Sequence, residues 1–128
     1  MDRLERGVLG ERVAARLLTA QGFTIHKTRV RFPVGEIDIV AWEGPCLCFV
    51  EVRSRSSLEW GGPLDSLTDQ KRRRLIRAAR WYLQRLRSLP PETRFDVVAI
   101  QWHCGTRPTV ELIRNAFSVT FSLTTGSW

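Results

Sequence analysis

The sequence predicts an α/β fold in which helices flank a mixed central sheet. Two segments carry apolar residues at helical spacing, and five shorter segments alternate apolar and polar residues or carry an uninterrupted apolar run. Gly and Pro residues separate these segments. The predicted order is helix, three-strand meander, helix, strand and a final strand. This order fits a single domain over residues 1–117, followed by a C-terminal tail at residues 118–128.

The first helix is expected over residues 3–21, and Gly22 suits its C-terminal cap. Helical spacing predicts a buried stripe of four apolar residues: Leu4, Val8, Ala15 and Leu18. Glu11 falls in the same series, so a carboxylate is expected on or beside the buried face. It is either a boundary residue paired with an arginine or part of a functional site.

Three strands are expected next, at residues 23–31, 36–42 and 46–55. In the second strand, strict alternation places these residues on one face: Ile37, Ile39 and Ala41. The other face of that strand then carries Glu36, Asp38, Val40 and Trp42. The third strand alternates in the same way, with Glu51, Arg53 and Arg55 on one face and Val50 and Val52 on the other.

The turn at residues 43–46 predicts the register of the last two strands. If its loop has two or four residues, opposed residues have numbers that sum to 89, so Asp38 faces Glu51 and Glu36 faces Arg53. Directly opposed Cβ atoms lie roughly 4.5–5.5 Å apart, and like charges there destabilise a sheet. Two carboxylates kept in this position indicate a function. A loop of three or five residues would shift the register by one residue.

A second helix is expected after a loop at residues 56–67. Thr68 suits its N-cap, and Pro90 and Pro91 stop it after about residues 86–89. Its predicted buried stripe contains Leu75, Ala79, Tyr82 and Leu86, with arginines on the other sides. A strand at residues 94–102, a turn region at 103–108 and a final strand at 109–114 complete the domain.

The composition of the 128 residues limits the classes of protein and partner. A hydrophobic content of 43% argues against a disordered chain, and the apolar runs are too short for a transmembrane helix. With no signal peptide at its start, the chain is expected to be cytoplasmic and without a membrane partner. Three cysteines without a CxxC pair predict buried or half-buried thiols.

The net charge of +7 comes from 20 Lys and Arg residues against 13 acidic ones, and only Lys27 and Lys71 are lysines. Arginine binds phosphate with two parallel hydrogen bonds, which suits a polyanionic partner. A charged surface that keeps the protein soluble, or a genome rich in Arg codons, would give the same composition.

The candidate chemical site contains Asp38 and Glu51, with Arg53 beside them and Glu11 on the first helix. Mg²⁺ prefers one or two carboxylates together with water and phosphate oxygens. A cation of this kind stabilises charge that develops on a phosphodiester.

Several short motifs occur in a fixed order: Gly10-Glu11, Gly35-Glu36-Ile37-Asp38, Phe49-Val50-Glu51-Val52-Arg53, Lys71, Arg94-Phe95-Asp96 and Ile113-Arg114-Asn115-Ala116-Phe117. In this order they resemble the YraN-like family over residues 6–117. That family is similar to the restriction-endonuclease-like superfamily, the PD-(D/E)xK nucleases, and distantly to archaeal Holliday-junction resolvases. The resemblance implies a DNA endonuclease that depends on Mg²⁺ or Mn²⁺ and acts on branched or duplex DNA. A homodimer is one arrangement that it implies.

Position by position, the resemblance makes Asp38 and Glu51 the metal ligands, together with the backbone carbonyl of Val52. Glu11 corresponds to a first-helix Glu of the resolvase branch and is expected to bind the cation directly or through water. Arg53 departs from the pattern, because the family usually has Lys there and Arg is too basic to accept a proton. The residues expected to contact nucleic acid are Arg55, Gln70, Lys71, Arg72 and Arg73. Glu36 is either a further ligand or the ion-pair partner of Arg53.

Three functions therefore stay open. The first is a metal-dependent endonuclease. The second is a nucleic-acid-binding module that kept the nuclease scaffold but lost turnover at Arg53. The third is an adaptor whose basic surface docks on an acidic protein.

Overall fold

The computed structural model describes residues 2–56 and 61–118, so the predicted tail lies outside the described residues except for Ser118. It contains two helices and five strands: α1 (Arg3–Ala20), β1 (Thr24–Phe32), β2 (Gly35–Glu43), β3 (Cys46–Ser56), α2 (Asp69–Leu83), β4 (Glu92–Trp102) and β5 (Thr109–Phe117). The strands form one sheet in sequence order, parallel between β3 and β4 and antiparallel elsewhere. The predicted fold class and order of elements are confirmed.

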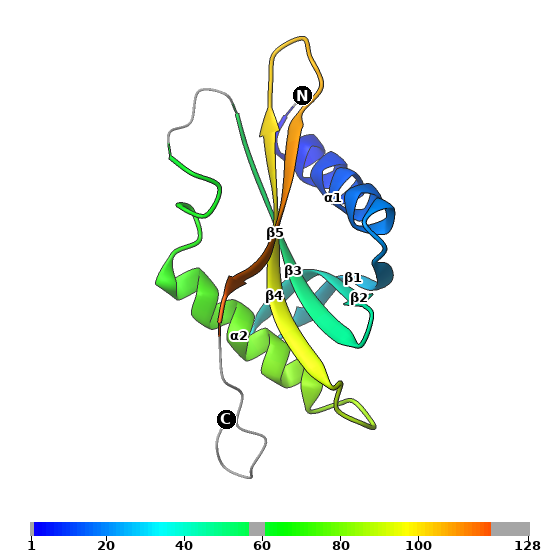
Figure 1. Cartoon of the computed structure of the whole chain (residues 1–128). Coiled ribbons are helices and arrows are strands. Elements are labelled where there is room, and N and C mark those ends of the chain that lie inside the picture. Colours follow the sequence, from blue (N-terminus) through cyan, green and yellow to red (C-terminus); the bar gives the residue numbers. More distant parts are fainter. Residues whose placement is uncertain (1, 57–60, 119–128) are drawn as a thin grey trace.

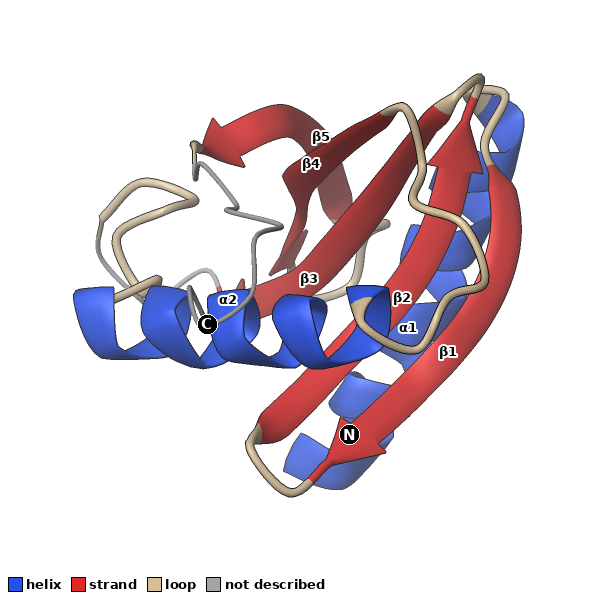
Figure 2. Ribbon diagram, turned by 90° about the horizontal axis from the view of Figure 1, so that it is seen from below, coloured by secondary structure: helices blue, strands red, loops and turns tan. Residues whose placement is uncertain are grey.

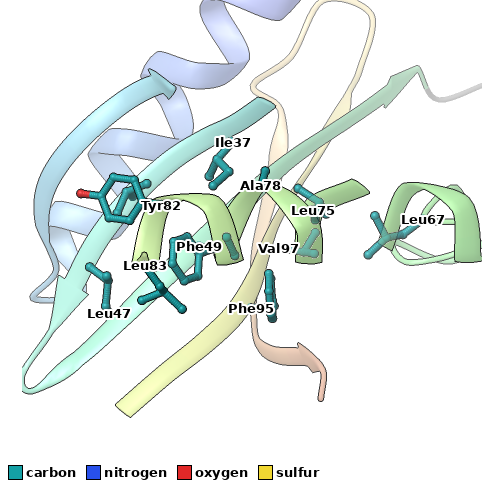
Figure 3. Close-up of a cluster of buried hydrophobic side chains, with 12 residues drawn as sticks. Ile37, Leu47, Phe49, Leu67, Leu75, Ala78, Tyr82, Leu83, Phe95 and Val97 are labelled. Atoms are coloured by element: carbon teal, nitrogen blue, oxygen red, sulfur yellow. The ribbon is translucent and has the colours of Figure 1, made fainter. Parts of the chain in front are cut away.

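The two helices cover opposite faces of the sheet (Figures 1 and 2). One buried cluster joins α2 to the sheet through Phe49, Tyr82 and Phe95, and Figure 3 shows this cluster. A second cluster joins α1 to the other face through Ala14, Leu18 and Val50. No helix among the described residues is long and apolar enough to cross a membrane.

The buried stripe of α1 differs from the predicted one. Its fully buried residues are Gly10, Ala14 and Leu18, whereas Leu4 is 78% exposed. Small residues face the sheet because the helix lies close to it: a Cβ at Gly10 would meet the Ile100 Cδ1 atom at 3.5 Å. The prediction was therefore right for Leu18 and wrong for Leu4, while Val8 and Ala15 are half-buried at the edge of the buried face.

The helix α2 begins where predicted and ends earlier. The Thr68 side chain accepts a hydrogen bond from the Lys71 amide at 3.3 Å, as expected of an N-cap. The helix ends at Leu83 rather than at residues 86–89, because the amides of Arg85 and Leu86 bond three residues back in a tighter turn. Most of the predicted stripe is buried.

The predicted register of β2 and β3 is confirmed from Glu43↔Cys46 to Ile39↔Val50, and the ladder stops there. The predicted alternation of β2 is wrong beyond that point. Ile39 packs with the α1 cluster, but Ile37 packs with the α2 cluster, although strict alternation would put both on one face. The reversal falls at Asp38, which lies opposite Arg29 in β1, and Arg29 has a left-handed backbone with φ 51°.

Cys46 and Cys48 are buried free thiols, as predicted. Cys104 is exposed because it lies in the turn between β4 and β5, which corrects the expectation of a buried thiol.

An ion-pair network joins β2, β4 and β5 at the sheet end away from Asp38. The Glu43 carboxylate accepts hydrogen bonds from Arg94 Nη2 and Arg114 Nη2, both at 2.6 Å. Arg94 also donates to the buried carboxylate of Asp96 at 2.7 and 2.8 Å. The bond from Arg114, followed by that from Arg94, lowers the pKa of Glu43 from 4.5 to about 2.

Replacing Glu43 with glutamine is expected to reduce the pH dependence of stability in acid. The Glu43 pKa is lower in the folded state, so its contribution is present above pH 4.5 and is lost as the pH falls towards 2. We expect Glu43→Gln to cost roughly 1–3 kcal/mol at pH 7 and little at pH 2. Urea denaturation at several pH values measures this difference. An equal loss at both pH values would contradict the electrostatic explanation.

Candidate metal and nucleic-acid site

The site lies where β2 and β3 separate. Beyond the Ile39↔Val50 pair, the Asp38 carboxylate accepts the backbone N–H of Val52 through Oδ2 at 2.8 Å. In a regular antiparallel ladder a backbone carbonyl would accept this bond. The N–H and C=O groups of one strand residue point to the same neighbour. The Val52 carbonyl is therefore directed towards the same opening as its N–H.

Glu51 lies close enough to Asp38 for a hydrogen bond between the two side chains to raise the Glu51 pKa, although the β2–β3 ladder ends one pair earlier, at Ile39↔Val50. Burial raises the pKa of Glu51 most, and the hydrogen bond and the charge of Asp38 raise it further. Arg53 and Lys71 act in the opposite direction. Glu51 therefore holds its proton more tightly than an isolated carboxylate does, and a bound cation could replace that proton.

Replacing Glu51 with glutamine is expected to stabilise the metal-free protein at alkaline pH. The Glu51 pKa is raised on folding, so its contribution is fully present below pH 4.5 and decreases as the pH rises above that value. A neutral amide removes this loss. Denaturation curves of wild type and Glu51→Gln should therefore diverge with rising pH, in favour of the variant. A stability difference that does not change with pH would contradict the raised pKa.

Glu51 also opens into a groove of about 530 Å³ between the β1–β2 hairpin and α2. The charged side chains that line it are Arg31, Glu36, Glu51, Arg53, Lys71 and Arg74. Four of these six are cations, so the groove has an excess of positive charge around the half-buried Glu51. A phosphate group would be attracted there.

Arg53 lies between this groove and the loop that follows β3. Its Nε donates to the Ser66 hydroxyl at 3.0 Å, which orients the guanidinium and leaves its other N–H groups for a ligand. Arg55, two residues further on, donates to the Gly61 carbonyl. Both arginines are thus held by residues 61–66, which follow residues 57–60 in the sequence.

Glu11 and Glu36 form ion pairs with arginines of β1. Glu11 pairs with Arg29, and Glu36 lies opposite Arg31 and within 3.9 Å of its Nε. Among the described residues, no ion pair joins Glu36 to Arg53, and no three His, Cys, Asp or Glu side chains gather into a metal-binding group. The structure thus brings Asp38 and Glu51 together, whereas Glu11 is paired with Arg29, whose pKa the Asp38 charge also raises.

The predicted nucleic-acid contacts on α2 divide into two groups. Lys71 lines the groove, and Gln70 and Arg73 are exposed at the start of the helix. Arg72 is turned towards β5, where its guanidinium lies over the Phe117 ring at 5.6 Å. Position on the same helix turn therefore does not give these side chains the same environment.

Sequence reasoning missed Arg29, Arg31 and Arg74. Arg31 and Arg74 line the groove, and Arg29 lies close enough to Glu36 and Asp38 for their charges to raise its pKa, after the larger effect of Glu11. Nothing in the sequence distinguishes these three from the other arginines. A non-glycine residue in the left-handed region is uncommon and often lies near a functional site.

Comparison with known proteins places most of the chain in one group of sequences. The model of the uncharacterised protein family UPF0102 matches residues 10–100. The chain is 47% identical to a UPF0102 protein of Symbiobacterium thermophilum, over 87% of this chain and 94% of that protein. It is 45% identical to one of Desulfosudis oleivorans, over 91% and 92% of the two chains. A relative from Moorella thermoacetica is 44% identical over 91% and 98%.

Proposed function

The chain belongs to the uncharacterised protein family UPF0102, and we propose that it hydrolyses phosphodiester bonds in DNA with a divalent cation, Mg²⁺ or Mn²⁺. The observation that carries this proposal is the contact between Asp38 and Glu51 where β2 and β3 separate. Two carboxylates this close are unfavourable for stability when both are ionised, because like charges repel. A cation would relieve their repulsion.

The donor atoms in the opening fit a hard cation. The Asp38 and Glu51 carboxylates and the Val52 carbonyl would hold it, and all three supply oxygen, which Mg²⁺ and Mn²⁺ prefer. The hydrogen bond from Val52 N–H to Asp38 keeps one ligand in place. When bound, the cation would act as a Lewis acid on a phosphodiester and activate water.

The surrounding cations would bind and orient the DNA. Arg53, held by Ser66, presents N–H donors to a phosphate, and Lys71 approaches the same groove from α2. Both would stabilise negative charge that develops on the phosphoryl oxygens. Arg53 does not accept a proton, so its contribution would be electrostatic.

The replacement of the family's usual Lys by Arg53 supports a second candidate, a module that binds DNA without cutting it. Both candidates use the same positive groove and differ in turnover. The adaptor hypothesis requires the groove to prefer an acidic protein to DNA.

A cleavage assay separates these functions. Purified protein is mixed with branched, single-stranded and duplex DNA, with and without Mg²⁺ or Mn²⁺, and binding is measured at several salt concentrations. Cleavage that requires the cation supports the nuclease. Salt-dependent binding without cleavage supports the binding module, and cleavage gained by Arg53→Lys would identify the cause. The absence of both binding and cleavage would contradict both functions.

A further inference from the structure

A second cavity lies beyond the groove, at the carboxyl ends of β3 and β4. Its volume is about 150 Å³. The ends of β3 and β4 and the start of β5 form one side, and residues 62–66 contribute the other. Its polar side chains include those of Arg53 and Arg55 on β3, Gln101 on β4 and Glu111 on β5.

Arg53 connects this cavity to the groove, because it lines both. A phosphate bound by Arg53 near Glu51 would therefore place the next nucleotide of the same strand at the cavity entrance. Arg55 lies on the same face of β3 as Arg53 and provides a second guanidinium for the strand's backbone. The two cations thus mark a path from the carboxylates into the cavity.

The side chains of β4 and β5 in the cavity suit a base rather than a phosphate. Gln101 is half-buried, and neither Gln101 nor Glu111 has a hydrogen-bond or ion-pair partner recorded in the described part of the chain. An amide both donates and accepts, and a carboxylate accepts the amino hydrogens of a base. Pro63 and Ala99 supply apolar surface beside them.

The volume of the cavity limits what can enter. A cavity of roughly 150 Å³ accommodates one six-membered aromatic ring. A base pair is too large for it, so a base must be unpaired to enter. Proteins commonly read unpaired bases by stacking and by hydrogen bonds to their edges.

We infer that this cavity binds one unpaired nucleobase of the DNA strand whose phosphate lies at Arg53. The inference rests on the proposed function and narrows its substrate to DNA with an unpaired nucleotide next to the cleaved bond. The base anchors the strand, while Arg53 and Arg55 hold its backbone.

Three labelled DNA duplexes test this inference. One is fully paired, one carries a short thymidine loop, and one carries the same loop with abasic residues. Binding is measured without metal by fluorescence anisotropy, and cleavage is measured with Mn²⁺. The thymidine loop should bind roughly 10-fold more tightly than the abasic loop, because a pair of side-chain hydrogen bonds to one base contributes on this scale.

Two variants assign the preference to the cavity. Gln101→Leu removes hydrogen bonds at similar size, and Ala99→Phe fills the cavity. Both should reduce the difference between the thymidine and abasic loops to less than about 2-fold, which is a small part of the contribution of one base. Gln21→Leu, at the exposed end of α1, is the matched control and should keep the full difference. If Ala99→Phe does not fold, Gln101→Leu decides the question.

The outcomes distinguish this inference from the proposed function. Equal binding of thymidine and abasic loops by the wild type, or an unchanged preference in Gln101→Leu, overturns the base site. Cleavage of all three duplexes at equal rates also overturns it but leaves the nuclease intact. Preferential binding without cleavage supports the base site and contradicts turnover. If the protein binds no DNA, both fail.

Discussion

Replacing Asp38 with asparagine is expected to lower metal-dependent DNA cleavage roughly a hundred- to a thousand-fold, the range typical for the loss of one electrostatic group at a reaction centre. The asparagine carbonyl can still accept the Val52 N–H, so the strands should keep their arrangement. The negative charge that would bind the cation is lost. Gel assays of DNA cleavage in Mg²⁺ or Mn²⁺ measure the effect.

Asp38→Ala separates the structural role of Asp38 from its chemical role. Alanine removes both the charge and the acceptor for Val52, so this variant should lose activity and also some stability. Asp69→Asn, at the exposed start of α2, is the control and should cleave as the wild type does. Cleavage that persists in both Asp38 variants would end the proposal that this carboxylate holds the cation.

Replacing Asp96 with alanine is expected to cost roughly 3–5 kcal/mol of folding free energy, as the loss of one partner from a buried ion pair usually does. Asp96 is 1% exposed and accepts three hydrogen bonds, two from Arg94 and one from the Asn115 amide at 2.9 Å. Alanine would leave the Arg94 charge and a backbone donor without these acceptors. The midpoint of urea denaturation measures the loss.

Glu92→Ala is the matched control for Asp96, because it removes an exposed carboxylate from the same strand. Its effect should remain within roughly 0.5 kcal/mol. A similar small effect for Asp96→Ala would contradict the role of the network in holding β4 to β5. Residual structure in a destabilised Asp96→Ala protein can be followed by circular dichroism.

Asp38 and Asp96 show why similar motifs in the sequence have different roles. The motifs around Asp38 and Asp96 both place an acid in or beside an apolar strand. Arg94 lies two residues from Asp96 and neutralises it, whereas Asp38 has Glu51 as its neighbour. The first arrangement stabilises the fold, and the second is suited to a cation.

The sequence predicted much of the candidate site through one register calculation. The β2–β3 turn sets which residues face each other, and the confirmed register runs up to Ile39↔Val50, next to Asp38 and Glu51. Continued regularly, the same register pairs Glu36 with Arg53. The reversal at Asp38 and Arg29 breaks the ladder, so Glu36 pairs with Arg31 instead.

The sequence by itself determined the order of the elements, the N-cap of α2 and the start of the β2–β3 ladder. These features depend on spacing and turn residues that are close together in the chain. Only the tertiary structure decided which face of α1 is buried, that Arg29 pairs with Glu11, and that Arg53 lines a cavity with Gln101 and Glu111. Contacts of this kind join residues far apart in sequence, and their geometry depends on how closely the helices and strands pack.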